Sequence, residues 1–269
     1  MSMAQNGGEV LAYLGNSRTR LSILEALVQE DELSRSELMA TVETSRTTLW
    51  RLVKDFEERG WVREIDEGYS ATSAGRLVLD RVHSLQATAR AVEELGDLLQ
   101  CLELEAMDFP IEQLADAKVV RPTTADPQGP MRLAVRQIRE ATDIDILSRA
   151  YSPRVVEAIY EPVLAGEQTI TMVLTDGVLE AFNSDDEIRR RVREMVGTDY
   201  LRLYRAAEPI TFIFAILDGE RIGMGIDDHE GRPQAVLDIE DPEVVDWAIR
   251  THERYRSGAS PVGPERFSD

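Results

Sequence analysis

The segment from residue 44 to residue 54 combines hydroxyl side chains with cations. It reads TSRTTLWRLVK, and its three basic residues are not accompanied by an acidic one. Arginine can bind O6 and N7 of guanine through both ends of its guanidinium group, while hydroxyl groups reach phosphate oxygens. If the segment is a helix with its apolar residues facing inward, its other face is a candidate for the major groove of DNA. The alternative is a helix face that is merely solvated. The predicted DNA contacts, which include one arginine from a following strand, are Ser45, Arg46, Thr47, Thr48, Trp50, Arg51, Lys54 and Arg63.

A second group of polar and aromatic side chains follows two expected strands in the second half of the chain. In α/β sheets, ligands bind at the carboxyl ends of strands, close to helix N-termini. An arginine at such a place would suit an anionic metabolite. A structural turn with a surface arginine explains the same residues, and the sequence leaves both interpretations open. The candidate ligand contacts are Ser148, Arg149, Tyr151, Ser152, Tyr160 and Thr175.

Patterns for metal binding and catalysis are weak. The run 227–231, DDHEG, offers oxygen and imidazole ligands, but consecutive side chains diverge and a turn after a strand explains the run better. The single cysteine, Cys101, lies among leucines and is expected to be a buried thiol. The Gly-Met-Gly run at 223–225 lacks the Lys-Ser/Thr of a phosphate-binding loop. We therefore expect no metal site, no cofactor and no enzymatic activity.

Hydrophobic spacing predicts three helices and a hairpin in the first third of the chain. The first helix covers about residues 17–29, the second begins at a capping box formed by Ser34 and Glu37, and the third covers about residues 45–59. Two alternating strands then flank an acidic tip at residues 66–68. This order is that of a winged helix-turn-helix domain, which we assign to residues 1–72. Because the tip is acidic, the wing is expected to reach a DNA backbone only through its arginine.

A long helical pattern follows, from an expected N-cap at Thr72 to about residue 104. Its apolar residues recur with a period near 3.5, and such a seam needs a partner. We expect a second copy of the same helix more than burial within the chain, so the protein is predicted to be a homodimer. Residues 73–118 are assigned to this helix and linker. The predicted dimer contacts are Val78, Val82, Leu85, Val92 and Leu99.

The rest of the chain, residues 119–269, alternates between helix and strand patterns. Residues 119–130 contain three prolines and a glycine and are expected to form the linker. The pattern of the remaining residues predicts an α/β domain. Together with the winged helix-turn-helix domain, this gives the whole chain an α+β fold class. The expected elements are helices at about 131–141, from Ser152-Pro153, through the arginines of 189–193 and at 241–256, and strands at 144–147, 169–174, 210–217, 221–226 and 235–237.

The charge of the chain is strongly negative and unevenly distributed. The 269 residues have a formal net charge of −20, which excludes a generally basic nucleic-acid coat. Residues 17–90 hold 11 basic and 13 acidic residues, whereas residues 91–269 hold 19 and 36. Many acids with almost no lysine are typical of the cytoplasm of a halophile, because hydrated carboxylates keep a protein dissolved in concentrated salt. No apolar run is long enough for a signal peptide or a membrane span, so we expect a cytoplasmic protein.

Several stretches resemble a family of archaeal regulators. Residues 45–51 and 57–62, with the helix start at 17–20, resemble archaeal winged-helix transcription regulators. The second half resembles the effector domain of the methanogenesis-regulator (FilR-type) family, which recurs in haloarchaea. The matching stretches there are 145–147 with its following helix, 169–179 and 246–256. The resemblance implies a homodimeric DNA-binding regulator and leaves its ligand undefined.

The effector domain of this family resembles the phospholipase D fold, whose chemistry needs a histidine two residues before a lysine. His83, His229 and His252 have no such partner, so nuclease activity of that kind is not expected. We expect a regulator that binds double-stranded DNA as a homodimer and whose second domain senses a small molecule or mediates oligomerisation. The alternative is a protein-interaction adaptor or scaffold that has a winged helix and senses no ligand.

Overall fold

The computed structural model describes residues 3–228 and 230–268, and it divides into two compact units, Met1–Ala89 and Arg90–Asp269. We call them the N-terminal and C-terminal units. Their boundary lies within helix α5 (Ser73–Leu95), whereas the sequence pattern placed domain limits after residues 72 and 118. Among the described residues, no helix is long and apolar enough to cross a membrane.

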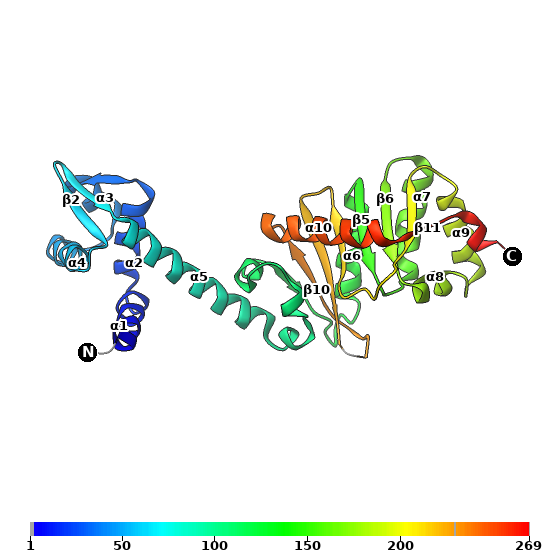
Figure 1. Cartoon of the computed structure of the whole chain (residues 1–269), viewed down its shortest axis with the longest axis horizontal. Coiled ribbons are helices and arrows are strands. Elements are labelled where there is room, and N and C mark those ends of the chain that lie inside the picture. The colour runs from blue at the N-terminus through cyan, green and yellow to red at the C-terminus, as the bar shows by residue number, and fades with distance from the viewer. Residues whose placement is uncertain (1–2, 229, 269) are drawn as a thin grey trace. The chain divides into compact units, whose positions relative to one another are not determined.

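The N-terminal unit is a winged helix-turn-helix domain, as the sequence predicted (Figure 1). Its strands form a three-stranded antiparallel sheet in the order β1-β3-β2, which packs beside the helices. The first helix and the first strand were not expected from the sequence. The elements are α1 (Met3–Gly15), α2 (Arg18–Gln29), β1 (Glu32–Ser34), α3 (Arg35–Thr41), α4 (Arg46–Glu58), β2 (Val62–Ile65), β3 (Gly68–Ala71) and the first turns of α5.

Local sequence explains where these helices begin and end. Ser34 and Glu37 form the predicted capping box, in which the backbone N–H of Ser34 donates to the Glu37 carboxylate at 2.9 Å and the N–H of Glu37 donates to the Ser34 hydroxyl at 3.2 Å. The hydroxyl of Thr72 accepts from the N–H of Gly75 at 3.1 Å at the start of α5. Gly60 follows α4 with φ +73°, a left-handed conformation that glycine adopts without strain.

Helix α1 is held by Tyr13, whose ring lies at the edge of the aromatic core. Its centroid is 6.2 Å from that of Phe56 and 6.2 Å from that of Trp61. Its hydroxyl donates to the Asp55 carboxylate on α4 at 3.1 Å. Because Phe56 and Trp61 are buried, this contact ties α1 to the helix that carries the predicted DNA contacts.

Helix α5 ends at Leu95, so the prediction that it continues to about residue 104 is wrong. Gly96 has φ +52°, which turns the chain out of the α-helix. Three short 3₁₀ helices follow, η1 (Gly96–Cys101), η2 (Leu104–Ala106) and η3 (Ile111–Leu114). Leu98 of η1 and Leu114 of η3 pack in the core of the C-terminal unit, and Cys101 packs against that core half-buried.

The C-terminal unit is built on a mixed sheet of eight strands in the order β11-β7-β6-β5-β8-β9-β10-β4. The neighbours β5, β6 and β7 are parallel, and the other pairs are antiparallel. The two edge strands, β4 and β11, and the inner strand β7 were not expected. The strands are β4 (Lys118–Val120), β5 (Asp143–Ser148), β6 (Thr169–Leu174), β7 (Leu201–Arg205), β8 (Ile213–Leu217), β9 (Arg221–Asp227), β10 (Pro233–Ile239) and β11 (Ser260–Val262).

The proline-containing stretch 119–130 is part of this unit, which corrects its prediction as a linker. Val119 and Val120 pair with Leu237 and Val236 in the sheet, because two β-branched residues suit an edge strand. Pro130 lies in the first turn of α6, where a missing N–H costs nothing.

Helices cover both faces of the sheet. Side chains alternate along each strand, so that Ile146 joins the core under α6–α9 while Leu147 joins the core under α10 and the 3₁₀ helices. Figure 1 shows α10 running across the strands. The helices are α6 (Gly129–Glu140), α7 (Pro153–Ala165), α8 (Asp176–Phe182), α9 (Asp186–Val196), α10 (Pro242–Gly258) and the 3₁₀ helix η4 (Pro264–Phe267).

Candidate nucleic-acid interface and ligand cavity

Helix α4 separates an apolar inner face from a polar outer face. Ser45 caps the helix by accepting from the N–H of Thr48 at 3.2 Å. The inner face enters the core of the N-terminal unit and consists of Leu49, Leu52, Val53 and Phe56. Burial of these four residues fixes the rotation of α4, so that the residues between them face solvent.

The outer face of α4 is exposed and positively charged. Arg46, Thr47, Arg51 and Lys54 are all exposed. Arg51 lies 3.5 Å from Asp55 in the next turn, an exposed pair that holds the guanidinium only weakly. Within the described residues, Arg46 and Lys54 have no ionic partner. The face can therefore bind phosphate oxygens or base edges without first breaking a strong ion pair.

Three of the predicted DNA contacts have structural tasks as well. The hydroxyl of Ser45 donates to Thr48 Oγ1 at 2.9 Å besides capping the helix, so both hydroxyls are engaged. Trp50 is half-buried against Tyr69 of β3, with ring centroids 5.9 Å apart and ring planes 35° apart. Trp50 thus fixes the distance between α4 and the wing.

The wing places Arg63 on the exposed side of β2. Arg35, at the start of α3, was not predicted to be functional. Its guanidinium pairs with Glu64 of β2 and lies 5.8 Å from the centroid of the Tyr69 ring. A groove of about 840 Å³ brings Arg35 together with Arg46 of α4. The signal in the sequence was the cation directly after the capping Ser34.

The predicted dimer contacts fall into two groups. Val82 is 5 % exposed and Val78 is half-buried, and both pack in the core of the N-terminal unit. Leu99 packs against the core of the C-terminal unit. Val82 is thus engaged within its own chain, which corrects its assignment to a partner helix, whereas Val78 and Leu99 are only partly buried. The exposed large apolar side chains of α5 are Leu77 (58 %), Leu85 (53 %) and Val92 (45 %).

An apolar cavity of about 320 Å³ lies in the C-terminal unit, between α6, α7 and the sheet. Of the predicted ligand contacts, Ser148, Tyr151 and Ser152 line it. The Tyr151 ring meets the edge of Phe182 at 5.6 Å between centroids. Burial raises the pKa of Tyr151, as do the nearby charges of Asp185 and Glu157, so its hydroxyl stays protonated and can donate a hydrogen bond. Pro122 and Pro127 from the stretch predicted as a linker also line this cavity.

The other three predicted ligand contacts do not line this cavity. Arg149 instead pairs with Asp227 of β9 at 2.5 Å. Tyr160 donates to Glu194 on α9, and Thr175 is the N-cap residue of α8. The geometry therefore does not place Arg149 where it could hold an anionic ligand inside the cavity.

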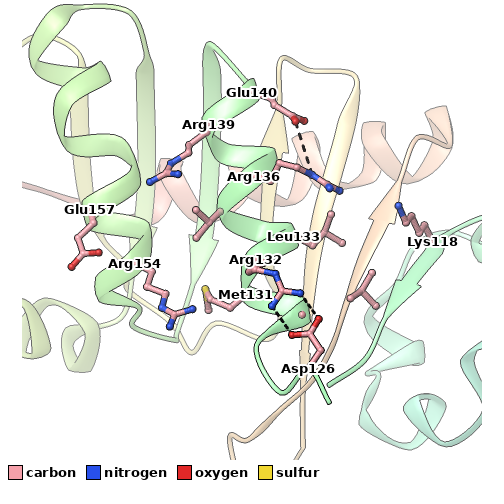
Figure 2. A pocket seen from close by; sticks show the side chains of 13 residues that line it. Lys118, Asp126, Met131, Arg132, Leu133, Arg136, Arg139, Glu140, Arg154 and Glu157 are labelled. Atoms are coloured by element: carbon pink, nitrogen blue, oxygen red, sulfur yellow. Dashed lines mark hydrogen bonds and ion pairs between the residues drawn. The ribbon is translucent and has the colours of Figure 1, made fainter. Parts of the chain in front are cut away.

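A second concave surface, which we call the arginine groove, lies over α6 (Figure 2). It has a volume of about 750 Å³ and was not predicted. Asp126 forms a two-fold ion pair with Arg132, which lowers the pKa of the Asp126 carboxyl group. Its charged residues are Lys118, Arg132, Arg136, Arg139 and Arg154 together with Asp126, Glu140 and Glu157.

The candidate metal run at 227–231 lies at the connection between β9 and β10. Asp228 accepts hydrogen bonds from the backbone N–H groups of Glu230 and Arg232, both at 2.9 Å, as expected for a turn. His229 lies outside the described residues. Within the described part of the chain, no group of three or more His, Cys, Asp or Glu side chains could hold a metal ion.

Two family models match most of the chain between them. Residues 127–258 match the middle domain of the methanogenesis regulatory protein FilR1, and residues 9–94 match the HVO_A0261 N-terminal domain. The chain therefore contains a FilR1-type middle domain and an HVO_A0261-type N-terminal domain. The FilR1 match contains α6, α7 and β5–β10, which form most of the apolar cavity, and the N-terminal match contains α4 and the wing.

Solved structures give more distant likenesses. The archaeal chromatin protein TrmBL2, described as showing a novel mode of DNA binding, is 17 % identical with a TM-score of 0.42, over 90 % of this chain and 93 % of TrmBL2. Nuc from Salmonella typhimurium, a phospholipase D family member, is 12 % identical with a TM-score of 0.42, and NucT from Helicobacter pylori is 9 % identical with a TM-score of 0.41. Each of these covers 55 % of this chain and 99 % of its own. Likenesses of this extent do not establish a shared activity. A search of curated proteins found no significant match.

Proposed function

We propose that this protein is a regulator that binds double-stranded DNA as a homodimer in the cytoplasm, with α4 in the major groove. Its C-terminal unit binds a small-molecule effector that changes the affinity for DNA, and it acts by binding rather than by turnover. The family supports the regulatory role. The remaining parts of the proposal rest on the geometry of the two units.

The outer face of α4 is the observation that carries DNA binding. It presents two cations without an ionic partner among the described residues, Arg46 and Lys54, and a weakly paired Arg51. No acidic residue lies on α4 before Asp55. In a chain of net charge −20, a helix face of this kind favours a polyanionic partner.

The apolar cavity supports effector binding. Its volume of about 320 Å³ lies at the lower end of the range of about 300–1,000 Å³ in which small-molecule sites fall. An effector changes DNA affinity only if it binds the DNA-competent and DNA-free arrangements of the dimer with different affinities.

Substitution of the α4 cations tests the DNA-binding part. Arg46→Ala and Arg51→Ala should each weaken binding to duplexes enriched from genomic DNA by the wild-type protein, by about tenfold for each lost base contact. The matched control is Arg18→Ala at the start of α2, because Arg18 is exposed and lies neither on α4 nor on α5. The assay is a titration of labelled duplex at one salt concentration. Unchanged binding by both α4 variants would show that α4 is not the DNA-binding helix.

A further inference from the structure

The arginine groove has a charge opposite to that of the surrounding unit. Residues 91–269 hold 19 basic and 36 acidic residues, yet the groove gathers five cations and three acids. Two of the acids lie against their own arginines, with Asp126 on Arg132 and Glu140 at 4.0 Å from Arg136. Within the described residues, Lys118, Arg139 and Arg154 have no ionic partner. Like charges gathered without partners in this way favour an anion as the occupant.

Arg139 and Arg154 come from different helices and line the same groove. Figure 2 shows Arg139 of α6 and Arg154 of α7 extending toward the gap between the two helices, with Arg154 near Met131 and Arg139 further toward the end of α6. Guanidinium groups bind carboxylate and phosphate oxygens in a planar two-pronged geometry. A head group that leaves the cavity beside Met131 can therefore accept hydrogen bonds from Arg154, and Arg139 adds to the positive charge of the groove.

The groove adjoins the apolar cavity, and Met131 lines both spaces. The Ser152 hydroxyl donates to the Met131 sulfur at 3.4 Å, a weak hydrogen bond at the start of α7. Successive residues face the two spaces, since Arg154 lines the groove and the next residue, Val155, lines the cavity. A thioether side chain with three rotatable bonds moves easily, so Met131 is a flexible part of the wall between groove and cavity.

The cavity itself is unsuited to a charge. Its Ser148 hydroxyl already donates to the Ala150 carbonyl at 2.9 Å, and its carboxylate, Asp227, is bound to Arg149. An anion enclosed there would lose its hydration without gaining a cation. A ligand that uses both spaces must keep its charged end in the groove.

We propose that the effector is an amphipathic anion, with its apolar chain in the cavity past Met131 and its carboxylate or phosphate head group at Arg154 in the groove, where Arg139 adds to the positive charge. This inference rests on the effector part of the proposed function and narrows it to one class of ligand. At about 30 Å³ for a group the size of a water molecule, 320 Å³ holds a chain of about ten heavy atoms.

Calorimetric titration of the full-length protein with four probes tests the inference. Decanoate and decyl phosphate carry both parts of the ligand, 1-decanol carries the chain alone, and inorganic phosphate carries a head group alone. We expect decanoate or decyl phosphate to bind at least about tenfold more tightly than 1-decanol, and inorganic phosphate to bind more weakly than either. The comparison between decanoate and decyl phosphate identifies the preferred head group.

Two sets of variants separate the two spaces. Arg139→Gln with Arg154→Gln should reduce the affinity for the preferred anion by about tenfold and leave 1-decanol unaffected. Ala134→Leu, which adds volume on the cavity side of α6, should weaken the binding of every probe with a chain. The charge-matched control is Arg193→Gln with Arg202→Gln, two exposed arginines outside the groove. Circular dichroism confirms that each variant is folded before titration.

Equal affinities for decanoate and 1-decanol, unaffected by the arginine variants, would overturn the inference in favour of a neutral ligand. Equal binding of phosphate and decyl phosphate, unaffected by Ala134→Leu, would overturn it in favour of a simple anion site. Absence of binding by all four probes would overturn it as well. None of these outcomes bears on DNA binding by α4, which is measured separately with the α4 variants.

Discussion

A single ion pair engages the arginine that the sequence predicted as a ligand contact of the C-terminal unit. Arg149 follows β5 directly, where a cation is well placed to meet a ligand, but it binds Asp227 at 2.5 Å and donates to the Thr211 carbonyl at 2.8 Å. The sequence could not reveal this, because Asp227 is 78 residues further along the chain. The cavity is left apolar, and the cations available to a ligand are those of the groove over α6.

His252 is the buried titratable group of the C-terminal unit with the clearest consequence for stability. It lies on α10 with 3 % of its surface exposed, and its Nδ1 is 4.0 Å from the Asp145 carboxylate. Its Nε2 is buried without a hydrogen-bond partner. Burial lowers the pKa of His252, and the positive charge of Arg256 lowers it further, against the opposite effects of Asp145 and Glu253.

The lowered pKa of His252 predicts a loss of stability in weak acid. The unfolded chain takes up a proton near pH 6.5 more readily than the folded chain, so the contribution is present above pH 6.5 and is lost as the pH falls toward the folded pKa. The loss is at most about 1.4 kcal/mol per pH unit. We expect urea unfolding between pH 7.5 and pH 5.5 to show a steeper loss of stability for the wild type than for His252→Gln. Parallel curves for the two proteins would show that His252 is protonated equally in both states.

At the scale of elements, α5 shows why a periodic apolar pattern does not identify its own partner. The pattern gave one continuous seam, but the residues divide between two cores and solvent. Val82 completes the winged-helix core, whereas Leu85, three residues later, is 53 % exposed. Helical spacing alone does not distinguish burial within the chain from burial against a second copy.

This division predicts different outcomes for neighbouring substitutions on α5. Leu77→Glu with Leu85→Glu should convert the proposed dimer to a monomer without loss of fold, because both side chains are exposed. Val82→Glu should instead unfold the N-terminal unit, since it buries an unpaired charge. Light scattering measures the mass, and circular dichroism measures helix content. A folded dimer in the Leu77 and Leu85 variant would place the dimer interface elsewhere.

The sequence predicted elements that have strong local signals and missed those that depend on distant partners. The capping box of Ser34, the helix that begins at Pro153 and the strand Thr169–Leu174 were all predicted and are found. β1 and β4 are three residues long and exist through pairing with β3 and β10. The groove and the cavity could not be predicted from the sequence for the same reason, because their residues come from segments that meet only in the folded chain. The predicted DNA contacts lie on one helix and one strand, where local periodicity was sufficient to group them.

At the scale of the whole molecule, the net charge of −20 restricts how DNA can be bound. Acidic surfaces repel the duplex, so affinity depends on a small number of cations. The predicted contacts contain four cations per chain, Arg46, Arg51, Lys54 and Arg63. The cations of the proposed dimer can therefore neutralise at most about eight phosphates.

This count predicts a moderate salt dependence of DNA binding. The slope of log affinity against log salt concentration should be no steeper than about −7 for the dimer, because each phosphate contact contributes about −0.9. Lys54→Gln should flatten the slope by about two, one for each chain. Binding measured at several KCl concentrations provides both slopes. A wild-type slope near −10 would mean that further basic surfaces, such as the arginine groove, also contact DNA.

The strands at the two edges of the eight-stranded sheet cannot easily pair with a further strand. β4 and β11 each contain three residues, β11 includes Pro261, and β4 carries the exposed Lys118 and is followed two residues later by Pro122. Prolines and a lysine at sheet edges prevent strands of neighbouring molecules from adding on. Short edge strands of this kind disfavour aggregation through the sheet, also in high salt, which screens the repulsion between acidic surfaces.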